Sequence, residues 1–145
     1  MRRFFFYGTL LDHDVMALVI GRRLPPAAFT PAVLAGHARR RAKGMTYPVV
    51  VPSPAESVLG AVVGGLAARD VARLAAYEGP GYRIARLKVR IAGALETVSV
   101  FEPVAMRLQP SASAWDYALW KGRHKRPFVA RLRKALSGRS AYSRP

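Results

Sequence analysis

Residues 74–83, LAAYEGPGYR, contain the first group that could do chemistry. Glu78 ends a helix-like segment that stops at Gly79-Pro80-Gly81. The C-terminal end of a helix disfavours a carboxylate, because the helix macrodipole is already negative there. A carboxylate held at this place between Tyr77 and Tyr82 is a candidate general acid or base. An exposed Glu78 that pairs with a nearby arginine is the alternative, since the dipole repulsion costs only about 0.3–1 kcal/mol at an exposed site.

A general base that works near neutral pH needs a raised pKa. Raising the pKa of a glutamate from about 4.3 to near 7 takes about 3.7 kcal/mol, at 1.36 kcal/mol per unit. The helix dipole is too weak to supply this, so burial among aromatic side chains has to supply most of it. The enzyme hypothesis therefore requires Glu78 to face a closed pocket.

Tyr7-Gly8-Thr9-Leu10 is the second candidate stretch, and it follows an apolar run directly. A glycine lets the backbone approach a ligand closely, and a turn from strand to helix leaves N–H groups ready for an anion. Many strands end in a glycine turn, so this motif alone does not identify a site.

Other kinds of active site find no support in the sequence. His13, His37 and His124 lack the spacing of metal ligands, and the chain has no cysteine, so we expect no metal site and no disulfide. No G-x-S-x-G motif and no phosphate-binding loop occur. We expect no cofactor.

The chain is strongly basic, with 24 Lys and Arg against 8 Asp and Glu in 145 residues, a net charge of +16. Most of the cations are arginine and alanine is abundant, which is typical of a GC-rich genome, so we expect a bacterial source. From residue 117 to the end there are nine Lys and Arg and no acid. Such a segment binds nucleic acid or anionic lipid, or it is a solvated helix face, which we favour.

The apolar runs are too short for a membrane span. The longest, residues 15–20, has six residues, whereas a span needs about 20. The opening MRRFFFYGTLLD resembles a signal peptide, but Gly8 and Thr9 break the apolar block and no cleavage site follows. We expect a cytoplasmic protein.

Hydrophobic periodicity and turn residues predict an α+β fold with a mostly antiparallel sheet and short helices. We expect a bulge at the glycines of 57–66, a turn at Pro52 and Pro54, and a bulge near Ala85. Asp12, Asp70 and Ser113 are expected to begin helices. The expected strands are 3–7, 32–41, 46–52, 57–66, 82–91 and 97–104, the expected helices are 13–20, 70–78, 114–121 and 128–136, and residues 137–145 are expected to be frayed.

Three motifs together resemble the γ-glutamylcyclotransferase-like superfamily, particularly its γ-glutamylamine cyclotransferase-like branch. They are YGTL after an N-terminal strand, Tyr47-Pro48, and YEGPGYR. The resemblance covers residues 4 to about 104, and Trp115 and Trp120 fit the branch loosely. It implies a compact β-barrel-like core with short helices over a cavity. We expect this domain over residues 1–108 and a basic helical extension over 109–145.

The resemblance also implies an activity and site residues. In that family the loop matching Tyr7, Gly8, Thr9 and Leu10 binds the γ-glutamyl part of the substrate. The residue matching Glu78 is the general acid/base, and Tyr82 and Tyr47 match residues of the substrate pocket. The implied reaction releases 5-oxoproline from a γ-glutamyl amine or peptide by attack of the α-amine, without a cofactor.

Two departures from the family pattern put the pocket shape and the leaving amine in doubt. Ala75 replaces a frequent Asp, and Val49 replaces a frequent Gly. Two alternatives therefore stay open. One is an unusual γ-glutamyl carrier, and the other is a catalytically silent member that serves as a basic binding module for nucleic acid or acidic lipid.

Overall fold

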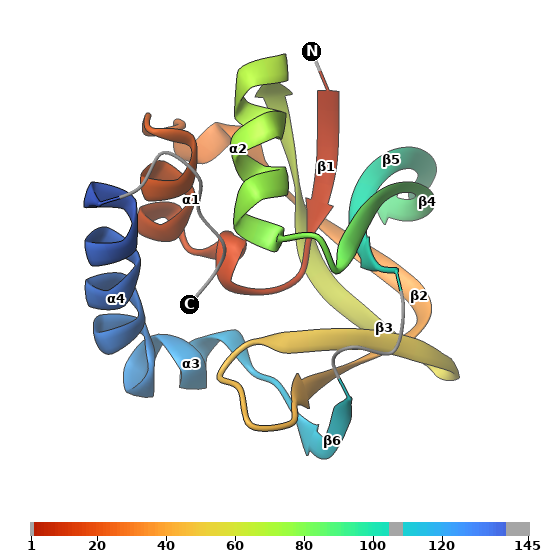
Figure 1. Ribbon diagram of the computed structural model, residues 1–145. Helices are drawn as coiled ribbons and strands as arrows, with labels where there is room; N and C mark the ends of the chain where they lie inside the picture. The colour runs from red at the N-terminus through yellow and green to blue at the C-terminus, as the bar shows by residue number, and fades with distance from the viewer. Residues whose placement is uncertain (1, 105–108, 139–145) are drawn as a thin grey trace.

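Five strands form a closed ring in the computed structural model, which describes residues 2–104 and 109–138. The strands lie in the order β3-β1-β5-β4-β2-β6, and β3 also pairs with β2, so β1 to β5 close on themselves (Figure 1). The sixth strand pairs with β2 outside this ring. Pairing is antiparallel except between β1 and β5. The strands are β1 (Arg2–Phe6), β2 (Phe29–Ala42), β3 (Pro48–Leu66), β4 (Tyr82–Ile91), β5 (Ala94–Pro103) and β6 (Pro110–Ala114).

The predicted α+β fold with a barrel-like core is confirmed. The ring is irregular, because β2 and β4 are joined at one residue pair, Val33 opposite Arg90. Four helices accompany the ring, and Figure 1 shows α1 and α4 side by side with α2 nearer to β1. They are α1 (His13–Ile20), α2 (Ala68–Glu78), α3 (Tyr117–Arg123) and α4 (Lys125–Ser137), with 3₁₀ turns at Thr9–Leu11 and Pro26–Ala28.

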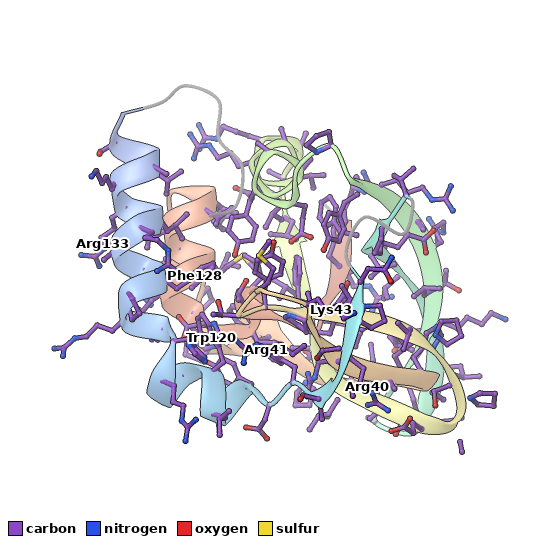
Figure 2. All side chains as sticks on the ribbon, turned by 60° about the horizontal axis from the view of Figure 1, so that its bottom comes forward. Arg40, Arg41, Lys43, Trp120, Phe128 and Arg133 are labelled. Carbon is purple, nitrogen blue, oxygen red and sulfur yellow. The ribbon has the colours of Figure 1, made fainter. Side chains whose placement is uncertain are left out.

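Two apolar cores lie on opposite sides of the sheet, because successive strand residues point to opposite faces. Phe5 belongs to one core, to which all five strands of the ring contribute. Phe4 and Phe6 belong to the other, between the sheet and the helices, together with Trp120 and Phe128. Figure 2 shows Trp120 and Phe128 pointing into the molecule and Arg133 pointing away from it.

Several local predictions are confirmed. The Asp12 side chain accepts hydrogen bonds from the N–H groups of Asp14 and Val15, and α1 begins there. Gly21 ends α1 with a left-handed φ of 78°. The expected glycine bulge is present, since the β1–β3 register shifts between Arg2 and Phe4, opposite Gly65 with a φ of 73°.

The predicted turn at Pro52 and Pro54 is wrong. Strand β3 runs from residue 48 to residue 66, but its pairing with β2 shifts where the turn was expected. Ala35 lies opposite Ser57 and His37 lies opposite Pro52, so residues 53–56 form a bulge without partners on β2. Pro54 lies in this bulge, where proline is tolerated, so two predicted strands are one.

Three further predictions are wrong. The β4–β5 register runs without a shift from Tyr82 to Ile91, so there is no bulge near Ala85. Without a bulge, Ile84 points to the opposite face from Leu87, and it is 39% exposed. Asp70 lies inside α2, where its carboxylate accepts from the N–H of Ala67. Ser113 belongs to β6, and Asp116 caps α3.

The predicted frayed end falls largely on residues 139–145, outside the described residues. Within the described ranges, no helix is both long enough and apolar enough to cross a membrane.

Candidate functional site

A pocket opens where β1 ends, α2 ends and β4 begins. It brings Glu78 and Tyr82 together with residues 7–10, which are about 70 positions away in the sequence. The sequence placed these residues in one site, and the structure brings them together. The lining consists of Phe5, Phe6, Tyr7, Gly8, Thr9, Leu10, Pro48, Glu78, Tyr82 and Phe101.

Tyr47 is placed differently from the expectation. Its side chain is buried, and it is the next residue, Pro48, that lines the pocket. The two departures from the family pattern also lie outside the lining: Ala75 is exposed on α2, and Val49 is buried. Neither departure from the family pattern therefore changes a residue of the pocket lining.

The pocket is narrow. It has about 30 Å³ of space for the centres of water molecules, and one water needs about 10–15 Å³ by the same measure.

The wall made by residues 7–10 is a tight turn against Pro48. The N–H of Leu11 donates to the carbonyl of Gly8 at 3.0 Å, and the N–H of Asp12 donates to that of Thr9 at 3.1 Å. The N–H groups of Gly8, Thr9 and Leu10 lie before the first residue that donates a hydrogen bond within this turn. Like the first N–H groups of any helix, they have no acceptor within the turn itself. A β-carbon at Gly8 would lie 3.1 Å from the Pro48 ring, so glycine is needed here for close approach of the two walls.

Tyr77 holds this turn in place. Its hydroxyl lies 2.6 Å from the Thr9 hydroxyl, and both side chains are buried. The bond joins the turn to the last turn of α2, one residue before Glu78. The sequence interpretation treated Tyr77 only as an apolar neighbour of Glu78 and missed this hydrogen bond. The available signal was that both residues belong to motifs, Thr9 to YGTL and Tyr77 to YEGPGYR.

Gly79 places Glu78 and Tyr82 on either side of one turn. Its N–H donates to the carbonyl of Ala75 at 3.0 Å and closes α2, and its φ of 89° requires glycine. Its carbonyl then accepts from the N–H of Tyr82 at 3.2 Å, where β4 begins. Glu78 is half-buried at this point.

The histidines lie apart from the pocket. His13 stacks on Phe29 with the ring centroids 4.0 Å apart, and His37 lies by the carbonyl of Ala35. Within the part of the chain that the structure describes, no three His, Asp or Glu side chains converge as metal ligands.

The curated relatives of this chain are plant proteins. Protein AIG2 C of Arabidopsis thaliana is 31% identical over 134 residues, covering 91% of this chain and 79% of the relative. AIG2-like protein A of the same plant is 29% identical, with the same two coverages. All five matching relatives come from Arabidopsis thaliana, which contradicts the expected bacterial source, and that prediction is wrong.

Solved structures share the fold. Two solution structures of Arabidopsis thaliana proteins superpose with TM-scores of 0.65 and 0.66, each at 28% identity. Both superpositions cover 94% of this chain. They cover 82% of the first Arabidopsis thaliana protein and 91% of the second. A structure titled Gamma-glutamyl cyclotransferase has a TM-score of 0.55 at 22% identity, covering 77% of this chain and 72% of its own, and this likeness concerns the fold alone.

Residues 4–127 match the family described as Gamma-glutamyl cyclotransferase, AIG2-like. The match includes the YGTL turn, Glu78 and Tyr82, and it extends beyond the sheet through α3. The chain therefore belongs to the AIG2-like gamma-glutamyl cyclotransferase family.

Proposed function

We propose that this protein is a γ-glutamylcyclotransferase-type enzyme that releases 5-oxoproline from a γ-glutamyl amine or peptide. The observation that carries the proposal is the pocket that Glu78 and Tyr82 line together with residues 7–10. Family membership supports it, since the lining of the pocket includes residues from all three family motifs: residues 7–10, Pro48, Glu78 and Tyr82. The leaving amine and a cytoplasmic location stay predictions.

The reaction needs a proton carrier. The α-amine of the glutamyl group attacks the γ-carbonyl, so that one C–N bond forms as the ring closes and the amide C–N bond breaks. Both partners belong to one molecule, and well-oriented reactions of this kind reach effective molarities of about 10⁵ M or more. The ammonium must lose a proton and the leaving nitrogen must gain one, and we assign both transfers to the carboxylate of Glu78.

The turn at residues 8–10 supplies the other half of the site. Its N–H groups hold the substrate carboxylate or the oxyanion that develops on the γ-carbonyl oxygen. The Thr9–Tyr77 hydrogen bond fixes the distance between this turn and the end of α2 that carries Glu78. Binding and proton transfer are therefore coupled through one contact.

Replacing the carboxylate tests the assignment. The Glu78→Gln variant keeps the size of the side chain and cannot carry the proton, so we expect the release of 5-oxoproline to fall by about 10²–10⁴-fold. The measurement is 5-oxoproline by mass spectrometry over a panel of γ-glutamyl amines and dipeptides. Undiminished release by Glu78→Gln would show that the assignment is wrong.

A matched control is Glu102→Gln on β5. Glu102 forms an ion pair with Arg83 at 2.9 Å, so the variant removes a carboxylate near the site without entering the pocket lining. We expect its rate to stay within about twofold of the wild type, as for most surface substitutions. An equal loss in both variants would contradict a specific role for Glu78.

Binding of nucleic acid or acidic lipid through the basic segment stays a prediction. The described part of the segment is helical, and its exposed cations are Lys121, Arg123, Arg126, Arg131, Arg133 and Lys134. This surface lies on α3 and α4 and does not line the pocket, so it is compatible with an active enzyme.

A further inference from the structure

Arg39 on β2 donates hydrogen bonds to three backbone carbonyls. Its Nη1 lies 3.0 Å from the carbonyl oxygen of Tyr7 and 2.9 Å from that of Leu59. Its Nε lies 3.2 Å from the carbonyl oxygen of Trp115. The guanidinium thus joins the end of β1, strand β3 and the segment before α3.

Trp115 extends this contact to the other wall of the pocket. The Arg39 guanidinium lies over the Trp115 ring, 5.2 Å from its centroid. The buried indole donates from Nε1 to the carbonyl of Thr46 at 2.8 Å, two residues before Pro48. The Arg39–Trp115 pair therefore holds Tyr7 on one wall and the chain leading to Pro48 on the other.

None of the three acceptors of Arg39 is a carboxylate. Burial lowers the pKa of the Arg39 guanidinium, and the charge of Asp116 opposes this effect. A partly buried charge that is held by neutral carbonyls gives up more hydration than a surface ion pair does. The arrangement favours a role in fixing backbone geometry over a role in charge pairing.

The planar peptide bond between Tyr7 and Gly8 relates the direction of the Tyr7 carbonyl to that of the Gly8 N–H. The described backbone has no cis peptide bond, and in a trans peptide the C=O and the following N–H point in opposite directions. Holding the Tyr7 carbonyl toward Arg39 therefore points the N–H of Gly8 away from Arg39. Gly8 lines the pocket, and Arg39 does not.

We propose that Arg39, supported by Trp115, is a positioning residue that aims the Gly8 N–H at the γ-glutamyl group. The proposal rests on the proposed function. We place the Gly8 N–H at the substrate carboxylate, which is present before and during the reaction. Misplacing this donor therefore weakens binding in both states, which raises KM and leaves kcat largely unchanged. A variant that only destabilises the fold lowers the active fraction instead, and KM stays constant.

The test compares Arg39→Met with Arg41→Met. Arg41 lies two positions along the same strand, and its Nε also donates to a carbonyl, that of Met45 at 2.6 Å, on the exposed surface. We expect Arg39→Met to raise KM for the γ-glutamyl substrate at least about 10-fold, since a 1 Å misplacement costs up to about 100-fold. Arg41→Met should leave KM unchanged. An unchanged KM in Arg39→Met would overturn the proposal.

A second measurement does not depend on turnover. The ¹⁵N–¹H signal of Gly8 reports the hydrogen bond to the preceding carbonyl, so it should shift in Arg39→Met and stay in place in Arg41→Met. An unmoved Gly8 signal in a folded Arg39→Met protein overturns the positioning role whatever the activity. If the signal shifts but the wild type releases no 5-oxoproline, the positioning geometry holds and the proposed function fails.

Discussion

Glu78 is held at the pocket by the residue before it. Tyr77 is fully buried, and its hydroxyl bonds to Thr9 on the opposite wall. The orientation of α2 therefore depends on this polar contact as well as on apolar packing.

Removing the Tyr77 hydroxyl should cost stability. In Tyr77→Phe the Thr9 hydroxyl stays buried without its partner, so we expect the free energy of unfolding to fall by about 1–3 kcal/mol. Urea denaturation measures this change. The double variant Thr9→Val with Tyr77→Phe removes both hydroxyls and should recover part of the loss. If Tyr77→Phe is as stable as the wild type, the Thr9–Tyr77 hydrogen bond does not stabilise the fold.

The sequence identified the pocket residues better than the residues that hold them. Glu78, Tyr82 and the YGTL turn belong to motifs, and motifs can be seen in one sequence. Arg39 lies in the run ARRR, where a strand pattern predicts a solvent-facing cation. Its role depends on carbonyls from three distant segments, and no local pattern encodes such contacts.

Among the elements, α1 is tied to both C-terminal helices by its first turn. The buried Asp12 carboxylate accepts from the Tyr117 hydroxyl at 2.9 Å and from Lys125 Nζ at 2.9 Å. Burial and the neighbouring Asp12 raise the pKa of Tyr117, which keeps its hydroxyl a donor. Lys125 also bonds to Asp14 at 2.7 Å. Burial alone would lower the pKa of Lys125, but its bonds to Asp14 and Asp12 outweigh it.

This tie should weaken in acid. The hydrogen bonds from Lys125 and Arg23 lower the pKa of Asp14 from 3.8 to about 2. A lowered pKa in the folded state means that the stabilisation is present above about pH 4 and is lost as the pH falls through 2. Asp14→Asn should therefore cost up to about 1 kcal/mol at pH 5, as expected for an exposed pair, and almost nothing near pH 2.

Urea unfolding at both pH values measures this difference between Asp14→Asn and the wild type. A difference that is the same at pH 5 and pH 2 would exclude the ionised Asp14 as its source.

The ends of a helix could be predicted where a capping residue marks them in the sequence. Asp12 and Gly21 define α1 as expected, because a cap acts on its own helix. The single strand β3 was not predicted, because the bulge at residues 53–56 that accommodates Pro54 depends on the pairing with β2. Ser113 failed as a cap because residues 110–114 pair with β2.

In the molecule as a whole, the acidic residues are distributed by role. Asp116 caps α3, and Glu78 lines the pocket. Ion pairs with Lys or Arg in the described part of the chain involve Asp12, Asp14, Glu56, Asp70, Glu96 and Glu102.

The C-terminal helices complete the core of the barrel domain. Phe128 and Leu132 are fully buried in the cluster that contains Phe4 and Phe6. The domain boundary near residue 108 stays a prediction. The shared core favours an extension that packs on the barrel domain over one that trails from it.

Truncating one of these side chains should destabilise the whole protein. Phe128→Ala removes a fully buried ring, so we expect the free energy of unfolding to fall by about 3–5 kcal/mol. Leu119→Ala on α3 is the control, because Leu119 is 54% exposed and should change stability by no more than about 0.5 kcal/mol. The two variants are compared by urea denaturation in one cooperative transition. A cost below about 1 kcal/mol for Phe128→Ala would mean that α4 docks only loosely.

The shared core also sets the order of events during synthesis. Phe4 in β1 packs in the same cluster as Leu132, and a ribosome adding about 5–20 residues per second needs about 6–25 s to make the intervening chain. Through this interval the aromatic run RFFFY lacks α4, which completes its core. An uncovered apolar strand of this kind is prone to aggregation, so the nascent chain is a good substrate for chaperones until its last helix emerges.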